Sequence, residues 1–133
     1  DLGKDDAWIN RQFGFAYSQL REYEKAISSF KKARELGAND SWLLYQLGLA
    51  LKEYGNIEEA INIFKEEIEI TDYKGFGDLQ LAWCYALIDE KEKAKEYFKN
   101  VDKYLASSLE KDEELKKDYN TVNELINSTT YIN

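Results

Sequence analysis

Residues 47–64 read LGLALKEYGNIEEAINIF, and two landmarks in this stretch recur along the chain at a spacing of 34 residues. The first landmark, Leu47-Gly48-x-x-Leu51, is repeated as Phe13-Gly14-x-x-Tyr17 and Leu81-Ala82-x-x-Tyr85. The second, Ala60-x-x-x-Phe64, is repeated as Ala26-x-x-x-Phe30 and Ala94-x-x-x-Phe98. A fixed period of this length is typical of stacked supersecondary units and predicts a repeat fold. Because such a fold works through a continuous surface, it needs no catalytic constellation.

The repeated units are predicted to be pairs of helices. Apolar residues within each unit recur at i, i+3, i+4 and i+7, and the chain contains no proline to break a helix. Gly37 and Gly55 are placed to end helices in the left-handed conformation, and Asp89 can do so less comfortably. The predicted helices are 6–20, 24–36, 41–54, 58–70, 75–88 and 91–105.

Small residues are expected to let the two helices of each pair approach closely. Gly14, Gly48 and Ala82 would face Ala26, Ala60 and Ala94 on the partner helices. The large side chains of Phe30, Phe64 and Phe98 would then fill the space one turn further along.

The pattern changes after the third pair. Leu115, Tyr119, Val122 and Ile126 form one apolar stripe in an otherwise polar segment, which predicts a capping helix over 109–127. Ser107-x-x-Glu110 fits a capping box that would open this helix. Residues 128–133 are predicted to be frayed.

These residues resemble the tetratricopeptide repeat family, whose units are helix-turn-helix pairs of 34 residues. The resemblance covers about residues 7–108 and implies an all-α fold, a right-handed α-solenoid of three repeats with a terminal capping helix. The expected organisation is a single domain over 1–133, with repeats at about 7–40, 41–74 and 75–108. The chain departs from the family pattern at Asn10 and Asp78, where an early aromatic is frequent, and at Glu67, where a small residue is usual.

The amino-acid composition argues against several classes of function. The net charge is −8, which argues against a nucleic-acid partner because such a surface needs a basic stripe. With no His and one Cys, the chain cannot build a Cys/His metal site or use an imidazole base. No run of about 20 apolar residues is present, so membrane insertion is not expected. We therefore expect no enzyme activity, no metal and no cofactor.

A second stripe runs along the first helix of each pair, two residues before the packing positions and about 200° around the helix. It should line the inner, concave side of the solenoid, and it contains all three tryptophans, including Trp8. The predicted peptide-binding groove comprises Arg11, Gln12, Phe15, Trp42, Tyr45, Gln46, Leu49, Phe76, Leu79, Gln80 and Trp83.

Two interpretations of this stripe stay open. Trp83, Tyr45 and Phe76 could anchor a partner, with Gln46 and Gln80 as amides that read its backbone. The same aromatic residues, Trp8 and Trp42 above all, could instead pack between neighbouring repeats, and the repeated glutamines could be chance.

The resemblance also implies a test of partner type. Family members that bind chaperone C-termini use a carboxylate clamp of Lys and Asn residues. Arg11 could replace one lysine, but the other clamp positions fall on Phe15, Gln46, Phe76 and Gln80. We therefore expect no recognition of chaperone tails by a clamp of that type.

The function predicted from the sequence is a scaffold-like protein-interaction module that binds a peptide or helix of a partner in the concave groove. The alternative is a structural role, in which the aromatic face mediates self-association or docks another part of a longer parent chain and regulates it. Residue usage favours a cytoplasmic, bacterial protein. The absence of Met, including an initiator, suggests a fragment of a longer chain.

Overall fold

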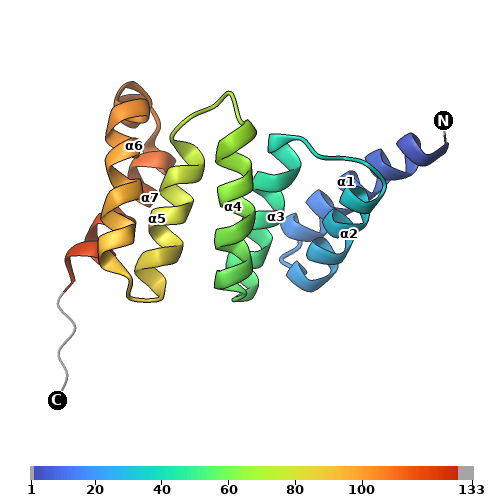
Figure 1. Cartoon of the computed structure of the whole chain (residues 1–133), viewed down its shortest axis with the longest axis horizontal. Helices are drawn as coiled ribbons and strands as arrows, with labels where there is room; N and C mark the ends of the chain where they lie inside the picture. The colour runs from blue at the N-terminus through green and yellow to red at the C-terminus, as the bar shows by residue number, and fades with distance from the viewer. Residues whose placement is uncertain (1, 129–133) are drawn as a thin grey trace, which may run out of the picture. The chain divides into compact units, whose positions relative to one another are not determined.

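The computed structural model describes residues 2–128, and side chains from residue 6 onward. Over this range the chain is all-α, as predicted, with seven helices (Figure 1). They are α1 (Leu2–Gln19), α2 (Tyr23–Glu35), α3 (Ser41–Tyr54), α4 (Ile57–Ile70), α5 (Phe76–Leu87), α6 (Lys91–Lys111) and α7 (Glu113–Asn127). None of these helices is long and apolar enough to cross a membrane.

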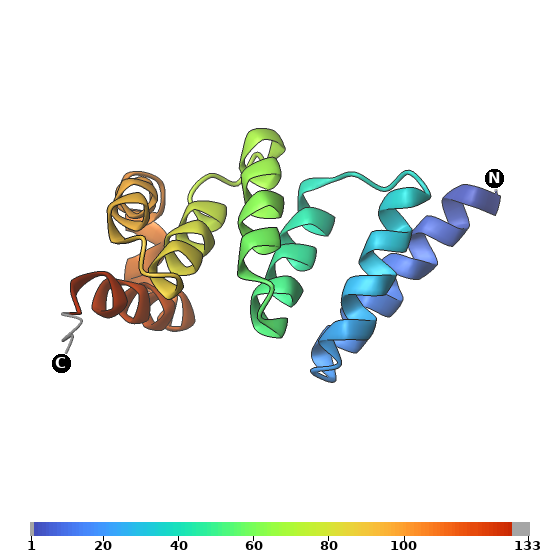
Figure 2. The same cartoon turned by 60° about the horizontal axis from the view of Figure 1, so that its bottom comes forward.

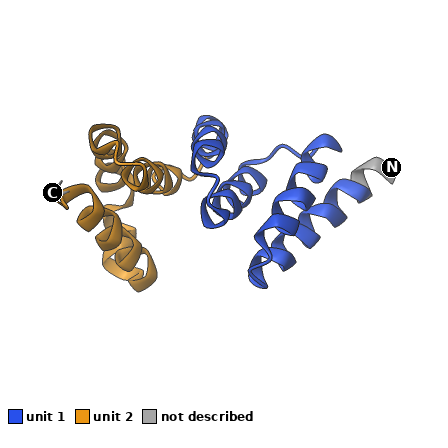
Figure 3. Cartoon of the chain, turned by 90° about the horizontal axis from the view of Figure 1, so that it is seen from below, with its two compact units in different colours: residues 1–71 blue, residues 72–133 orange. Residues whose placement is uncertain are grey.

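The helices form two compact units, residues 1–71 and residues 72–133 (Figure 3). In the first unit, α1 pairs with α2 and α3 pairs with α4 (Figure 2). Helix α2 also packs on α3. In the second unit, α5 pairs with α6, and α7 packs against both. The predicted helix pairs are thus present, while the single domain over 1–133 stays a prediction.

The turn inside each helix pair uses a left-handed residue at the same repeat position. Gly55 has φ +102° and ends α3, and Asp89 has φ +61° after α5, as the sequence predicted. Gly37, which follows α2, has φ +106° as expected. The first pair turns at Arg21, with φ +60°, and this turn was not predicted because arginine is not a residue that favours left-handed backbone.

Within the first unit, each helix pair is closed by a glycine that lies against a phenylalanine ring. A Cβ built on Gly14 would lie 2.5 Å from the Phe30 ring, and one on Gly48 would lie 2.6 Å from the Phe64 ring. Both rings are fully buried. The glycines therefore make room for the phenylalanines themselves, whereas we expected them to face Ala26 and Ala60.

The third pair packs differently, and the prediction for Phe98 is wrong. Ala82 replaces the glycine at the same repeat position and is fully buried, and a Cβ at that position would meet the phenylalanine ring in the other two pairs. Phe98 is half-buried and stacks on Tyr119 of α7, with ring centroids 4.6 Å apart. Phe98 therefore joins the pair to the capping helix.

The boundary between α6 and α7 also differs from the prediction. Helix α6 continues to Lys111, so Ser107 and Glu110 lie inside it and do not form a capping box. Asp112 is the N-cap of α7, and its side chain accepts a hydrogen bond from the backbone N–H of Leu115 at 3.0 Å.

The predicted apolar stripe of α7 is buried at Leu115, Val122 and Ile126, so this helix does cover α5 and α6. Of the tail predicted to be frayed, only Ser128 lies within the described residues, where it follows the last turn of α7.

Candidate functional site

The candidate site in the first unit begins on α1. Trp8, Arg11 and Phe15 follow one another at i, i+3 and i+7, so they share one face of the helix. Trp8 is 58% exposed and Phe15 is 38% exposed. The exposure of Trp8 does not fit the interpretation that it packs between neighbouring repeats.

Helix α3 supplies Trp42, which is positioned by the start of its helix. Asp40 is the N-cap of α3 and accepts a hydrogen bond from the backbone N–H of Leu43 at 2.8 Å. The same carboxylate forms an ion pair with the guanidinium of Arg11, at 3.1 Å. The Arg11 guanidinium in turn lies 4.8 Å from the centroid of the Trp42 ring, which is a cation–π geometry. Arg11 thus links the two first helices of the unit.

Trp42 packs against neighbouring rings and is also partly exposed. Its ring lies 5.9 Å from the ring of Phe15 and 6.3 Å from that of buried Phe30, centroid to centroid. It nevertheless keeps 37% of its surface exposed. Trp42 therefore packs against neighbouring rings and still keeps surface that a partner could contact, so its role in binding stays a prediction.

The remaining predicted residues of the first unit differ in exposure. Gln12 is exposed, while Tyr45, Gln46 and Leu49 are half-buried. Tyr45 packs its ring edge against Phe64 at 5.8 Å. We call Trp8, Arg11, Gln12, Phe15, Trp42, Tyr45, Gln46 and Leu49 the α1–α3 face.

The second unit contributes less than the sequence suggested. Phe76 and Trp83 on α5 are half-buried, but Leu79 and Gln80 are 2% and 4% exposed. A partner has no access to a side chain buried to that degree. The structure therefore does not give Gln80 the surface that a reader of a partner's backbone needs, although Gln12 and Gln46 have it.

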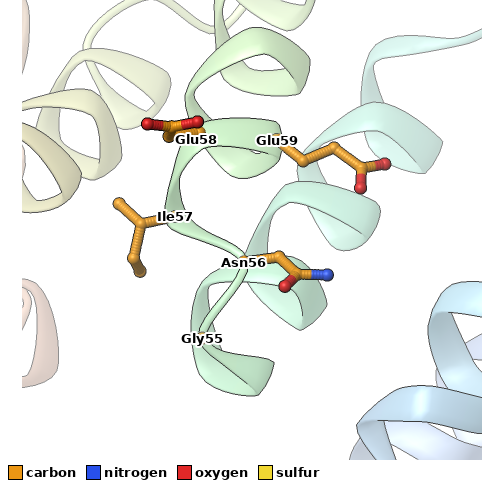
Figure 4. A pocket seen from close by; sticks show the side chains of 5 residues that line it. All are labelled: Gly55, Asn56, Ile57, Glu58 and Glu59. Carbon is orange, nitrogen blue, oxygen red and sulfur yellow. The ribbon is translucent and has the colours of Figure 1, made fainter.

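One hollow of the described surface lies at the turn between α3 and α4 and is lined by Gly55, Asn56, Ile57, Glu58 and Glu59. Its side chains point apart and do not converge on a common point (Figure 4). Glu59 is already paired with Lys31 at 2.8 Å. Among the described residues, no group of His, Cys, Asp and Glu could hold a metal ion.

Family models match most of this architecture. One tetratricopeptide repeat model matches residues 12–37 and 43–72, and a second matches residues 78–111. The chain belongs to the tetratricopeptide repeat family. The resemblance read from the 34-residue spacing is thereby confirmed.

Solved tetratricopeptide repeat structures share the fold. The TPR domain of Arabidopsis OM64 has a TM-score of 0.76 and 12% identity, over 93% of this chain and 96% of that one. The TPR2B domain of yeast Sti1, in complex with an Hsp70 peptide, has a TM-score of 0.74 and 16% identity, over 93% and 98%.

A bacterial structure is equally similar. The Yersinia enterocolitica type III secretion chaperone SycD, with a peptide of the translocator YopD, has a TM-score of 0.75 and 19% identity, over 92% of this chain and 90% of that one. No curated protein sequence matches the chain. At these identities the structural likeness establishes the fold alone.

The contact of Arg11 with Asp40 and Trp42 was not predicted from the sequence. The sequence did indicate the role of Asp40. This residue stands just before the predicted start of a helix and three residues before Leu43, which is the usual place of an N-cap. The pairing with Arg11 could not be read from the sequence, since it depends on how α1 and α3 approach each other.

Proposed function

We propose that this tetratricopeptide repeat protein is a non-catalytic interaction module, and that its α1–α3 face binds a peptide or helix of a partner protein. The observation that carries the proposal is the exposure of three aromatic side chains, Trp8, Phe15 and Trp42, along one face of the first unit. Large aromatic side chains of this kind dominate the binding energy of protein interfaces. Two relatives by fold, Sti1 TPR2B and SycD, were solved with bound peptides, which supports the same role here.

The chemistry of the face indicates which peptide it prefers. The aromatic rings suit aliphatic or aromatic anchors, and the exposed amide of Gln12 with the half-buried amide of Gln46 can hydrogen-bond a peptide backbone. Arg11 is the cation of this face, and its charge is already paired with Asp40. We therefore propose an apolar peptide with little dependence on salt, and no carboxylate clamp for a chaperone tail.

A displayed library of random peptides, selected against the whole chain, tests the proposal. Affinities of the selected peptides would then be measured for the wild type, for Trp8→Ser with Gln12→Ala, and for the control Tyr73→Ser. Tyr73 is 74% exposed but lies outside the α1–α3 face. We expect the double substitution to weaken binding at least about tenfold, the loss of one strong anchor, and the control to leave it unchanged.

Two outcomes would count against the proposal. If the selection returned no peptide above background, the face would not be a peptide site. If the double substitution and the control bound equally well, the site would lie elsewhere. In the second case Trp83→Ala would show whether α5 carries it.

Self-association is the second candidate, because exposed Trp8 and Phe15 would serve it equally well. Sedimentation of the wild type over a range of concentrations separates the two. A dimer with quenched tryptophan fluorescence that Trp8→Ser abolishes would favour self-association over peptide binding.

A further inference from the structure

A separate apolar stripe lies on α1, on the side of the helix away from Trp8 and Phe15. Ile9, Phe13 and Tyr17 follow at i, i+4 and i+8, and we call them the α1 end face. Ile9 is 41% exposed and Phe13 is 53% exposed, while Tyr17 is half-buried. Large apolar side chains exposed on consecutive turns of one helix are unusual on a surface that faces only water.

The equivalent apolar stripe of the second repeat is buried. Leu43, Leu47 and Leu51 occupy the same repeat positions on α3, and none is more than 1% exposed. Helix α2, the second helix of the preceding pair, packs against α3. The α1 end face therefore occupies repeat positions that are buried in the second repeat, where a preceding helix packs.

A sequence signal at the same end points to that helix. Leu2-Gly3-x-x-Asp6-x-Trp8 repeats Leu36-Gly37-x-x-Asp40-x-Trp42 at the 34-residue spacing. In the second occurrence these residues connect α2 to α3, with Gly37 at φ +106° and Asp40 as the N-cap. Residues 2–8 thus carry the sequence pattern of the connector between α2 and α3.

We infer that a further helix of the α2 type, preceding residue 2 in the same polypeptide, packs on the α1 end face. Its apolar side would carry small and aromatic residues at the spacing of Ala26, Phe30 and Ala33, which α2 buries. Like α2 against α3, it would run antiparallel to the helix that it covers.

The added helix would change the start of α1. In the present structure α1 begins at Leu2. With the connector engaged, α1 would begin at Ala7, and Asp6 would accept a hydrogen bond from the backbone N–H of Ile9, as Asp40 does from Leu43 at 2.8 Å. Asp6 would then act as an N-cap, which it does not do now.

An extended chain tests this inference, with a copy of residues 7–34 fused in front of Asp1 so that the connector keeps its register. Phe13→Asp in the original α1 should lower the unfolding midpoint of the extended chain and leave that of the present chain unchanged. Asp6→Ala should likewise lower the unfolding midpoint of the extended chain and leave that of the present chain unchanged. The matched control is Leu20→Asp, which should be silent in both chains, since Leu20 is 69% exposed and its counterpart Tyr54 is 49% exposed.

Equal effects of Phe13→Asp in the two chains would overturn the inference. So would a concentration-dependent dimer of the present chain that Phe13→Asp abolishes, because a second copy would then cover the face. If the extended chain did not fold, a synthetic peptide of residues 21–36 can be added to the present chain. An amide NMR spectrum with no peptide-dependent shift at Ile9 and Phe13 would likewise contradict it.

Discussion

Gly48 and Phe64 form the tightest contact between the helices of the second pair. Because a Cβ on Gly48 would lie 2.6 Å from the buried Phe64 ring, the Gly48→Ala variant must move the ring or separate the helices. We expect it to lower the free energy of unfolding by about 1–3 kcal/mol, the usual cost of overpacking. Urea denaturation followed by circular dichroism measures this loss.

The double variant Gly48→Ala with Phe64→Leu is the control for that prediction. A leucine occupies less of the contested space, so the double variant should lose less than the sum of the two single losses, as residues in contact do. Strict additivity would mean that the Cβ of residue 48 does not meet the ring.

Tyr119 is predicted to make the stability of the second unit depend on alkaline pH. Burial, the hydrogen bond that its hydroxyl donates to Asp102 at 2.6 Å and the charge of Asp102 raise the pKa of Tyr119 from 10.0 to about 12. The folded chain therefore holds the phenolic proton more tightly than the unfolded chain. This contribution is fully present below about pH 10 and is lost as the pH rises toward about 12.

The measurement compares the wild type with Tyr119→Phe, which keeps the ring stacked on Phe98 and removes the titrating group. The difference in their free energies of unfolding should shrink between about pH 10 and about pH 12. Other groups titrate in this range too, but they are common to both proteins. A difference that stayed constant over this range would contradict the raised pKa of Tyr119.

The packing of single residues could be predicted only where the repeat is regular. The spacing of Phe30 and Phe64 from their glycines identified two buried rings correctly. Phe98 has the same spacing, but one methyl group on Ala82 and a stacking partner on α7 place it elsewhere. The first cause was visible in the sequence, whereas the second required the position of α7.

At the scale of the helix, the N-cap of α7 gives a direct test of where that helix begins. The Asp112 side chain bonds the backbone N–H of Leu115, so Asp112→Ala should cost about 1 kcal/mol of stability. Ser107→Ala is the matched control, since Ser107 lies exposed inside α6 and should change little. Urea unfolding of both variants shows whether α7 begins after Asp112 or after Ser107. A larger loss of unfolding free energy for Ser107→Ala would favour the capping box at Ser107.

The periodicity predicted which helices exist and in what order, but it did not always predict where they end. Ends marked by glycine, such as Gly37 and Gly55, were predicted because left-handed backbone selects that residue. The end of α6 was placed at residue 105, although the helix continues to Lys111. Ser107-x-x-Glu110 fits a helix interior as well as a helix start, and only the partner of each backbone N–H separates the two.

The candidate site shows the same limit at the level of elements. The period predicted that one face of each first helix repeats, but it left open whether Trp8 and Trp42 are exposed, and in the first unit Trp8, Phe15 and Trp42 are exposed. It could not predict that Gln12 is exposed and Gln80 is buried, because equivalent positions in a repeat have different neighbours.

At the scale of the whole molecule, the capping helix α7 is predicted to stabilise the second unit more than the first. Leu115, Val122 and Ile126 are buried where α7 packs on α5 and α6, and each such side chain contributes about 1.5–3 kcal/mol when buried. In repeat proteins the stability is close to a sum of local and nearest-neighbour terms. A chain that ends at Lys111 should therefore lose stability mainly in the unit that α7 contacts.

The three tryptophans allow the two units to be followed separately. Trp83 alone, with Trp8 and Trp42 replaced by Phe, reports on the second unit, and the Trp83→Phe variant reports on the first. With α7 removed, the urea midpoint seen by Trp83 should fall far more than the midpoint seen by Trp8 and Trp42. Equal shifts at all three tryptophans would contradict local stabilisation, because they would show that residues 1–71 and 72–111 unfold as one cooperative block.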